Sequence, residues 1–396
     1  MRSLTRGGLS PAPGPNRKEE GTVHLPLAGI RVLDFSTLLP GPLASLILAE
    51  AGAEILKIER PDRGDEMRSY EPKFGRDSVN FALLNRGKRS LAIDLKDPAS
   101  MEKLRGLVAD ADIVLEQFRP DVMERLGLGY EILSTINEKI IYCSITGYGQ
   151  HGPLSRVAAH DLNYLAQSGM LGLSSDADGA PVLPPALIAD IAGGTYPAIV
   201  NILLALRSRD QTGRGCKLDI AMADNLFTFL YWAIGNGQLG KWPEAGGELV
   251  TGGSPRYQVY RTKDDRFVAA APLEEKFWLN FLQAIDAPAE LYDIEMPPAE
   301  CKRRVAQLIA LRTAQHWERQ FAGKDVCCAI VSTLEEAMNN PHFRSRGVFD
   351  RRVCADTAAI AALPIPLSAA FRGGSTEANY PSLGEANAEF GFPVKQ

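Results

Sequence analysis

A short alternation of strand and helix patterns near the start of the chain constrains the fold most strongly. Residues 30–35 are an apolar run of strand type, residues 43–51 are an apolar helix pattern, and residues 54–59 are a second strand. Pro40 and Gly52 stand at the two ends of the helix pattern, where proline and glycine are favoured. A strand, a helix and a strand in this order are typical of a βαβ unit, whose two strands lie parallel.

The same alternation continues through the first half of the chain and predicts a larger parallel sheet. Further strands are expected at residues 90–95, 112–117, 139–146 and 217–222, and further helices at residues 97–109, 198–206 and 225–234. Helices that separate parallel strands cover both faces of the sheet, so we expect the α/β fold class.

The pattern changes after residue 236. A stretch rich in glycine and polar residues, 236–254, is typical of a linker or mobile loop, and a β-hairpin is expected from residues 256–262 and 266–271. Helical patterns follow at residues 275–285, 299–312, 316–322 and 334–339. We therefore divide the chain into a disordered tail at 1–25, a large α/β domain at 26–224, a small α+β domain at 225–350 and a C-terminal segment at 351–396.

Composition and charge exclude several classes of function. The 396 residues include 43 lysines and arginines against 48 aspartates and glutamates, so the chain lacks the broad basic surface of a nucleic-acid-binding protein. No apolar run reaches the roughly 18 residues that span a bilayer, and the first 25 residues contain no apolar signal-peptide core, so we expect no membrane partner. The six cysteines show no CxxC spacing, which predicts no metal site, and reduced thiols fit a cytoplasmic location.

The first strand-to-helix turn lacks the usual nucleotide-binding loops. It carries Leu38-Leu39-Pro40-Gly41-Pro42 in place of GxGxxG, and no GxxxxGK[ST] occurs, so a nicotinamide-dependent dehydrogenase and a P-loop enzyme are disfavoured. Cations instead stand at the ends of predicted strands, in Ile58-Glu59-Arg60, in Arg86-Gly87-Lys88-Arg89 and at Arg119. Ligands of open α/β sheets bind beyond the carboxyl ends of the strands. These cations are therefore candidate contacts for a ligand with several phosphates, with ordinary surface charge as the alternative.

Four ionisable residues are candidates for catalysis. His160 and Asp161 stand at a predicted helix start, where N–H groups are free and the helix dipole favours negative charge. Asp190 precedes a double glycine that leads into a long apolar helix, and Glu274 follows the predicted hairpin. Each carboxylate could equally be a helix cap, so the residues alone leave both readings open.

Taken together, several segments resemble the family III CoA-transferase superfamily, the CaiB/BaiF group, and within it the α-methylacyl-CoA racemase branch. The similarity covers nearly the whole chain after the tail and is carried by LAGIRVLDFSTLLPGP, AEILKIERP, NRGKRSLAIDLK, HDLNYLAQSG, ADIAGG and PLEEKFW. The resemblance implies a large Rossmann-like domain, to which the C-terminal segment returns, and a small domain. It also implies an interlocked homodimer whose active site lies between the large domain of one subunit and the small domain of the other.

The same resemblance implies a role for each candidate residue. CoA, as part of the substrate rather than a tightly bound cofactor, would lie near Ile58, Glu59, Arg60, Arg86, Lys88, Arg89 and Arg119. In the racemase branch the residues matching His160 and Asp190 exchange the α-proton of an acyl-CoA. The residue matching Glu274 supports the histidine, and the helix start at Asp161 stabilises the enolate. In the transferase branch the residue matching Asp161 is the nucleophile that carries first the acyl group and then CoA.

Three functions remain open from the sequence. The leading one is an acyl-CoA racemase or epimerase that inverts the α-carbon of 2-methyl-branched acyl-CoA by two-base proton transfer. The alternative is CoA transfer between an acyl-CoA and a carboxylic acid through an intermediate on Asp161. A third is a catalytically silent acyl-CoA-binding subunit, against which the four intact residues argue. The resemblance favours the racemase branch, because typical transferases usually carry another residue, often tyrosine, where this chain has His160.

Overall fold

A sheet of six parallel strands forms the centre of the larger part of the molecule. The computed structural model describes residues 25–176, 178–356 and 358–393, so the predicted disordered tail lies outside the described residues except for its last residue. The strands run in the order β5-β2-β1-β6-β7-β8, which in chain order is the 3-2-1-4-5-6 arrangement of a Rossmann-like sheet. Their bounds are β1 Arg31–Asp34, β2 Glu54–Glu59, β5 Arg89–Ala92, β6 Ile113–Glu116, β7 Ile141–Thr146 and β8 Cys216–Ala221.

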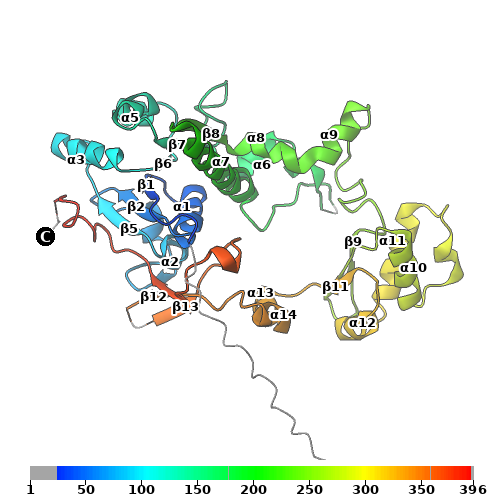
Figure 1. Ribbon diagram of the computed structural model, residues 1–396. Helices are drawn as coiled ribbons and strands as arrows, with labels where there is room; N and C mark the ends of the chain where they lie inside the picture. Colours follow the sequence, from blue (N-terminus) through cyan, green and yellow to red (C-terminus); the bar gives the residue numbers. More distant parts are fainter. Residues whose placement is uncertain (1–24, 177, 357, 394–396) are drawn as a thin grey trace, which may run out of the picture.

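Helices cover both faces of this sheet (Figure 1). Val32 of β1 packs into a core shared with α1 (Pro40–Glu50), α6 (Asp161–Gln167) and α7 (Tyr196–Thr212). The next residue, Leu33, packs into the opposite core with α3 (Pro98–Ala109), α4 (Val122–Arg125) and α5 (Tyr130–Ile136). Successive side chains of a strand point to opposite faces, so a strand buried on both sides is apolar throughout. The prediction of a covered parallel sheet is confirmed.

Shorter elements fill the connections. Between β2 and β5 lie η1 Glu66–Ser69, β3 Lys73–Phe74, β4 Asp77–Ser78 and α2 Val79–Asn85. Around α7 and β8 lie η2 Leu171–Leu173, η3 Ala189–Thr195, α8 Met222–Leu226, η4 Phe227–Leu230 and α9 Tyr231–Gln238. The helix expected at residues 225–234 is confirmed as helical throughout, but it consists of three consecutive segments because the chain changes helix type twice between α8 and α9.

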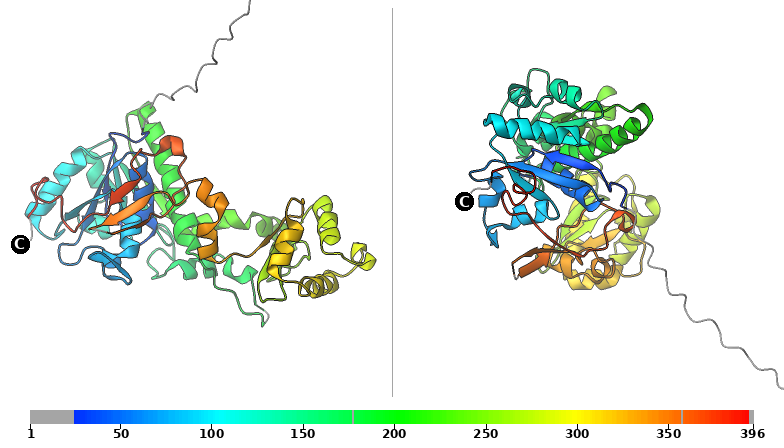
Figure 2. Two further views of the ribbon diagram at one scale, coloured as in Figure 1. Left: turned by 90° about the horizontal axis from the view of Figure 1, so that it is seen from below. Right: turned by 60° about the vertical axis from the view of Figure 1, so that its left-hand side comes forward.

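A second unit stands apart from the large sheet (Figure 2). Its sheet is antiparallel and has the order β11-β10-β9, with β9 Gln258–Arg261, β10 Phe267–Ala270 and β11 Cys328–Ile330. The predicted hairpin is confirmed as β9 and β10. The helices are α10 Glu275–Ala284, η5 Ala289–Tyr292, α11 Pro298–Ile309 and α12 Ala314–Phe321. Trp278, Phe281 and Trp317 belong to its own apolar core.

The chain then returns to the large sheet through α13 (Leu334–Asn339) and α14 (Pro341–Ser345). A small sheet follows, made of β12 Arg352–Ala355, β13 Ala358–Ala361 and β14 Glu377–Asn379, with η6 Ala369–Phe371 between the last two strands. Near the end of the chain, Asn387 accepts the N–H of Ala92 at 2.8 Å and donates to its carbonyl at 3.0 Å. The C-terminal segment therefore covers the edge strand β5, whose backbone groups would otherwise be unpaired.

One helical stretch, Ala189–Thr212, is long and apolar enough to cross a membrane by length and composition alone. Its residues Ala198, Ile202 and Leu206 belong to the core that the stretch shares with the parallel sheet. Packing against this sheet therefore accounts for much of its apolar character.

Candidate active site

A cavity of about 260 Å³ lies at the point where the strand order reverses, between the carboxyl ends of β1 and β6. Its wall includes Leu38 after β1 and Arg119 after β6. In open α/β sheets this reversal point is where ligands bind. His160 and Asp190 both line the cavity, so the structure brings these two predicted residues together.

His160 reaches the cavity from the position directly before α6. Its backbone N–H donates to the side-chain oxygen of Asn163 at 3.0 Å, which fixes the start of the helix. The hydroxyl of Tyr164 donates to the carbonyl of Ala159 at 2.8 Å and so holds the residue before His160 as well. A Cβ at Gly147 would lie 2.5 Å from the Tyr164 ring, so only glycine allows this ring to pack at the cavity wall. The His160 side chain is exposed and free to meet a ligand.

Asp190 lies in η3, a stretch of π-helix that continues directly into α7. Burial, and then the negative charge of Asp161, raise the pKa of Asp190 to about 7. The wide turns of π-helices occur frequently at functional sites. A Cβ at Gly193 would lie 2.4 Å from the carbonyl oxygen of Met222, so this glycine lets η3 pack directly on the start of α8. A half-buried carboxyl that titrates near neutrality is suited to proton transfer.

Asp161 is the first residue of α6 but is not among the residues that line the cavity. It is 5% exposed, and its carboxylate accepts the backbone N–H of Asp190 at 3.0 Å. Burial raises the pKa of Asp161, and backbone hydrogen bonds from Asp190 and Ala189 oppose that rise. The carboxylate therefore stabilises the first turn of η3, where backbone N–H groups have no partner within the helix.

Glu274 stands in the second unit, at the residue before α10, where it is exposed. It does not line the cavity, and α10 lies far from α6 in the chain's fold (Figure 1). Within one chain the structure therefore does not bring Glu274 to His160. The contact that the resemblance implies requires a second copy of the chain and stays a prediction.

Two of the predicted phosphate contacts stand at the carboxyl edge of the parallel sheet. Arg60 follows β2 directly, and Arg119 follows β6 by three residues and lines the cavity. Both side chains are exposed. Arg60 makes an ion pair with Asp62 at 3.2 Å, which is solvent-exposed and weak. These two guanidinium groups remain available to an anionic ligand.

Arg86 and Lys88 do not lie where the sequence analysis placed them. They precede β5, so they lie toward the amino end of that strand and not beyond its carboxyl end. Arg86 pairs with Glu50 at 2.6 Å and is almost fully buried. Lys88 is also buried, donates to the carbonyl of Pro42 at 2.8 Å, and lies 3.7 Å from the carboxylate of Asp34. Burial lowers the pKa of Lys88 to about 7 against the attraction of Asp34.

The remaining predicted contacts are also engaged inside the sheet. Arg89 is half-buried and forms ion pairs with Glu54, at 3.1 Å, and with Glu389. Ile58 and Glu59 are the buried last residues of β2. Glu59 pairs with Arg68 at 2.7 Å, and although burial alone would raise its pKa, this guanidinium holds the pKa of Glu59 at about 2. None of these three side chains lines the cavity.

A buried ionic cluster that sequence reasoning missed holds the loop after β1. Lys57 of β2 donates to the carbonyl of Ser36 at 2.8 Å and pairs with Asp65 at 2.9 Å. Asp65 also accepts the N–H of Leu38 at 3.2 Å, and Leu38 has a φ of 63° and lines the cavity. A left-handed leucine is unfavourable unless its surroundings hold it. The available signal was a lysine within an apolar strand, since such a charge is buried only with a partner.

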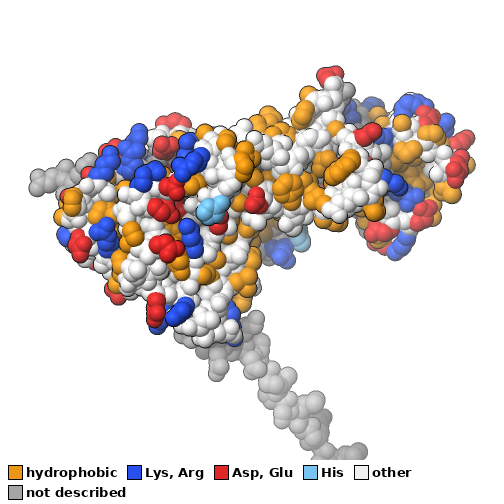
Figure 3. Space-filling view, turned by 90° about the horizontal axis from the view of Figure 1, so that it is seen from above, with side chains coloured by type: hydrophobic (Ala, Val, Ile, Leu, Met, Phe, Trp, Pro, Cys, Tyr) orange, Lys and Arg blue, Asp and Glu red, His pale blue; other side chains and the backbone are white. Residues whose placement is uncertain are grey.

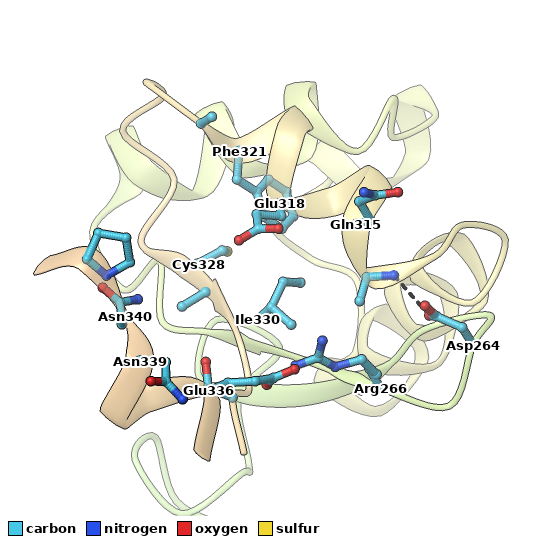
Figure 4. A pocket seen from close by; sticks show the side chains of 15 residues that line it. Asp264, Arg266, Gln315, Glu318, Phe321, Cys328, Ile330, Glu336, Asn339 and Asn340 are labelled. Atoms are coloured by element: carbon cyan, nitrogen blue, oxygen red, sulfur yellow. Dashed lines mark hydrogen bonds and ion pairs between the residues drawn. The ribbon is translucent and has the colours of Figure 1, made fainter. Parts of the chain in front are cut away.

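A larger cavity, of about 920 Å³, lies in the second unit beside α12, α13 and β11 (Figure 4). Three of its four charged side chains have partners: Asp264 accepts the N–H of Ala314 at 2.9 Å, and Arg266 pairs with Glu336 at 2.7 Å. It contains none of the four predicted catalytic residues. Among the described residues no three His, Cys, Asp or Glu side chains group as metal ligands. The smaller cavity at the sheet is therefore the candidate active site.

Known proteins resemble this chain over most of its length. The chain is 36% identical over 327 residues to an alpha-methylacyl-CoA racemase of Mus musculus, with 82% of each protein covered. It is 32% identical over 338 residues to a succinyl-CoA:glutarate CoA-transferase of Mus musculus, with 82% of this chain and 76% of the relative covered. The crystal structure of a CAIB/BAIF family protein from Brucella suis matches 92% of this chain and 98% of its own, with a TM-score of 0.78 and 26% identity. The model of CoA-transferase family III matches residues 27–387, and the chain belongs to this family.

Proposed function

We propose that this enzyme inverts the α-carbon of 2-methyl-branched acyl-CoA by two-base proton transfer. The observation that carries the proposal is that His160 and Asp190 line one cavity while the carboxylate of Asp161 is buried and accepts a backbone N–H. A racemase needs two proton-transfer groups that reach the same carbon. A covalent route needs instead a carboxylate that is free to attack the thioester. Relatives of both kinds have comparable identity, so the proposal rests on this geometry.

The proposed reaction consists of two proton transfers. One group takes the α-proton, the C–H electron pair moves into the thioester carbonyl to give an enolate, and the other group returns a proton to the opposite face. A general base works best when its pKa lies near the operating pH. The pKa of Asp190, raised to about 7 mainly by burial, meets this condition. His160 is the second group, and the two roles exchange when the opposite epimer is the substrate.

We also propose that Arg60 and Arg119 contact the CoA part of the substrate. Both are exposed at the carboxyl edge of the sheet, and a charge-assisted hydrogen bond to phosphate is stronger than a neutral one. Arg86, Lys88 and Arg89 would then act through the fold, because their ion pairs hold α2 and β5 in place. Ile58 and Glu59 would support the same edge as buried residues of β2.

A homodimer is the third part of the proposal. Large hydrophobic side chains are exposed on α7 and around α9, among them Leu204 at 62%, Tyr231 at 77% and Trp242 at 71%. Figure 3 shows exposed hydrophobic side chains over the middle of the molecule, between the large sheet and the second unit. Extended apolar surface of this kind is rare on monomers. A second copy that covered it could also bring its Glu274 to His160.

CoA transfer between an acyl-CoA and a carboxylic acid is the second candidate function. In its favour are the position of Asp161 beside Asp190 and the similarity to a succinyl-CoA:glutarate CoA-transferase. This reaction would require the Asp161 carboxylate to leave the N–H groups of η3 and turn into the cavity. Attack of this carboxylate on the thioester would break the C–S bond, release CoA thiolate and leave an acyl-aspartate anhydride. CoA thiolate would then attack the aspartyl carbonyl, release the acyl group as a carboxylate and leave a CoA thioester on Asp161.

The test is α-proton exchange into a 2-methyl-branched acyl-CoA in deuterated buffer without an acceptor acid. We expect exchange by the unmodified protein, and a loss of about 10²–10⁴-fold in His160→Ala and in Asp190→Ala. The matched control is His316→Ala, which removes an exposed histidine on α12 and should exchange normally.

A parallel measurement follows Asp161 itself. Hydroxylamine cleaves acyl anhydrides and thioesters, so mass spectrometry of the peptide that contains Asp161 detects either intermediate. We expect no hydroxamate and no CoA adduct during turnover. An adduct that forms in proportion to turnover, together with absent α-proton exchange, would replace the racemase proposal with the transferase.

A further inference from the structure

The first turn of η3 is capped by a residue distant in sequence. The position before η3 is Ile188, whose side chain has no hydrogen-bonding group and makes no cap. The carboxylate of Asp161 supplies the acceptor instead, through its 3.0 Å hydrogen bond from the N–H of Asp190. The residue that receives this bond is the one whose side chain lines the cavity. Two neighbouring helices are therefore joined at the residue proposed to move the proton.

The far end of η3 is held independently of Asp161. The hydroxyl of Thr195 donates to the carbonyl of Pro40 at 2.8 Å, and the side-chain amide of Asn225 donates to the carbonyl of Gly193 at 2.8 Å. These contacts fix η3 to α1 and α8. The end that carries Asp190 depends on Asp161, so loss of the acceptor would act locally and leave the rest of η3 anchored.

The charged surroundings of Asp190 are few. From the α6 side they are Asp161, Tyr164 and His160, and from the loop after β6 the cavity wall contributes Arg119. The other elements packed on η3 carry few titratable groups: α1 has none before Glu50, and α7 has only Tyr196 before Arg207. The strand β7 contributes Tyr142 and Cys143, which are buried in the core. The strand β8 contributes Cys216, Lys217 and Asp219, of which the last two line a neighbouring cavity. On α8, Asp224 is exposed and lines a neighbouring cavity. Asp161 is the charged group that acts on the Asp190 carboxyl.

We infer that the carboxylate of Asp161 is a positioning group, which holds the backbone of Asp190 at the cavity without itself touching the substrate. This inference rests on the proposed racemase function. If it holds, the two proton-transfer groups, His160 and Asp190, differ in how far they depend on Asp161. The aspartate side of the α-carbon depends on the Asp161 carboxylate for both geometry and proton affinity, because the hydrogen bond of that carboxylate goes to Asp190 and not to His160.

The two contributions separate in two variants. Asp161→Asn keeps an oxygen acceptor for the N–H of Asp190 and removes the negative charge, whereas Asp161→Ala removes both. The measurement is α-deuterium uptake from each purified epimer of a 2-methylacyl-CoA, as kcat/KM from about pH 5 to about pH 9, because the acid limb of kcat/KM reports the base of the free enzyme. Asp97→Asn is the matched control, since it makes the same change at the start of α3, far from the cavity.

We expect Asp161→Asn to move the acid limb down by about one pH unit for one epimer only, the one that Asp190 deprotonates. Asp161→Ala should slow the same epimer at least about tenfold further, and Asp97→Asn should change neither profile. An equal loss of kcat/KM for both epimers without a shift of the acid limb would mean that the substitution damages the whole site. Two unshifted pH profiles would mean that Asp161 does not influence Asp190. Either result overturns the inference. Failure of the proposed function is distinguishable, because then the unmodified protein takes up no deuterium from either epimer.

Discussion

Replacement of Asp190 by asparagine should stabilise the fold while it abolishes proton exchange. An unperturbed aspartate titrates at 3.8, and burial with the charge of Asp161 raises the pKa of Asp190 to about 7. Between these values the folded protein holds a proton that the unfolded chain has released, so the stability of the folded state falls as pH rises. The gap corresponds to an upper limit of about 4 kcal/mol at and above pH 7, since one pKa unit is worth about 1.4 kcal/mol.

The expected gain is smaller than this limit because Asp190 lies at a cavity wall and is only half-buried. We expect Asp190→Asn to raise the free energy of unfolding at about pH 8 by about 1–3 kcal/mol, with the gain shrinking toward about pH 4. The assay is urea denaturation of both proteins at the same protein concentration, since a dimer's apparent stability depends on concentration. Glu116, whose pKa burial also raises to about 7, is present in both proteins and cancels.

The result that refutes this reasoning is a variant that is less stable than the unmodified protein at pH 8, or a gain that does not change with pH. Asp97→Asn is the control for replacing a carboxylate at a helix start, and it should show no gain that grows with pH. A confirmed gain would show that the chain retains an unstable carboxyl at this position for its chemistry.

Three further predictions concern the cations and the assembly. Arg60→Ala combined with Arg119→Ala should raise the KM for acyl-CoA at least about tenfold with little change in kcat, as measured by steady-state deuterium uptake. An unchanged KM would show that neither residue contacts CoA. Lys88→Ala should lower the midpoint of thermal unfolding more clearly than it changes KM, because it removes the cation that pairs with the buried carboxylate of Asp34. A tenfold rise in KM at unchanged stability would contradict the buried role. Glu274→Ala and His160→Ala should each be nearly inactive alone, and co-expression of the two variants should restore part of the activity. The reason is that a mixed dimer contains one intact site if Glu274 acts across subunits. No restoration in an isolated mixed dimer would contradict this arrangement.

Much of the large sheet could be predicted because its signals are local. The strands β6 and β7 are mostly apolar runs, and proline and glycine mark both ends of α1, so periodicity and punctuation agree. The cations before β5 were misplaced for a different reason. The sequence shows that Arg86 and Lys88 stand near a strand, but only the packing of α1 and α2 shows that both side chains point into buried carboxylates.

The distinction between Asp161 and Asp190 lies beyond local pattern. Both are aspartates at predicted helix starts, and aspartate is common at ordinary helix caps. The structure separates them through one long-range hydrogen bond, in which the residue at position 161 caps the helix that carries the residue at 190. That bond leaves one carboxylate buried and the other at the cavity, with its pKa raised to about 7 chiefly by burial. Covalent capture by Asp161 would require η3 to lose the acceptor of its first turn at the moment of reaction. For this reason we propose proton transfer and not covalent catalysis.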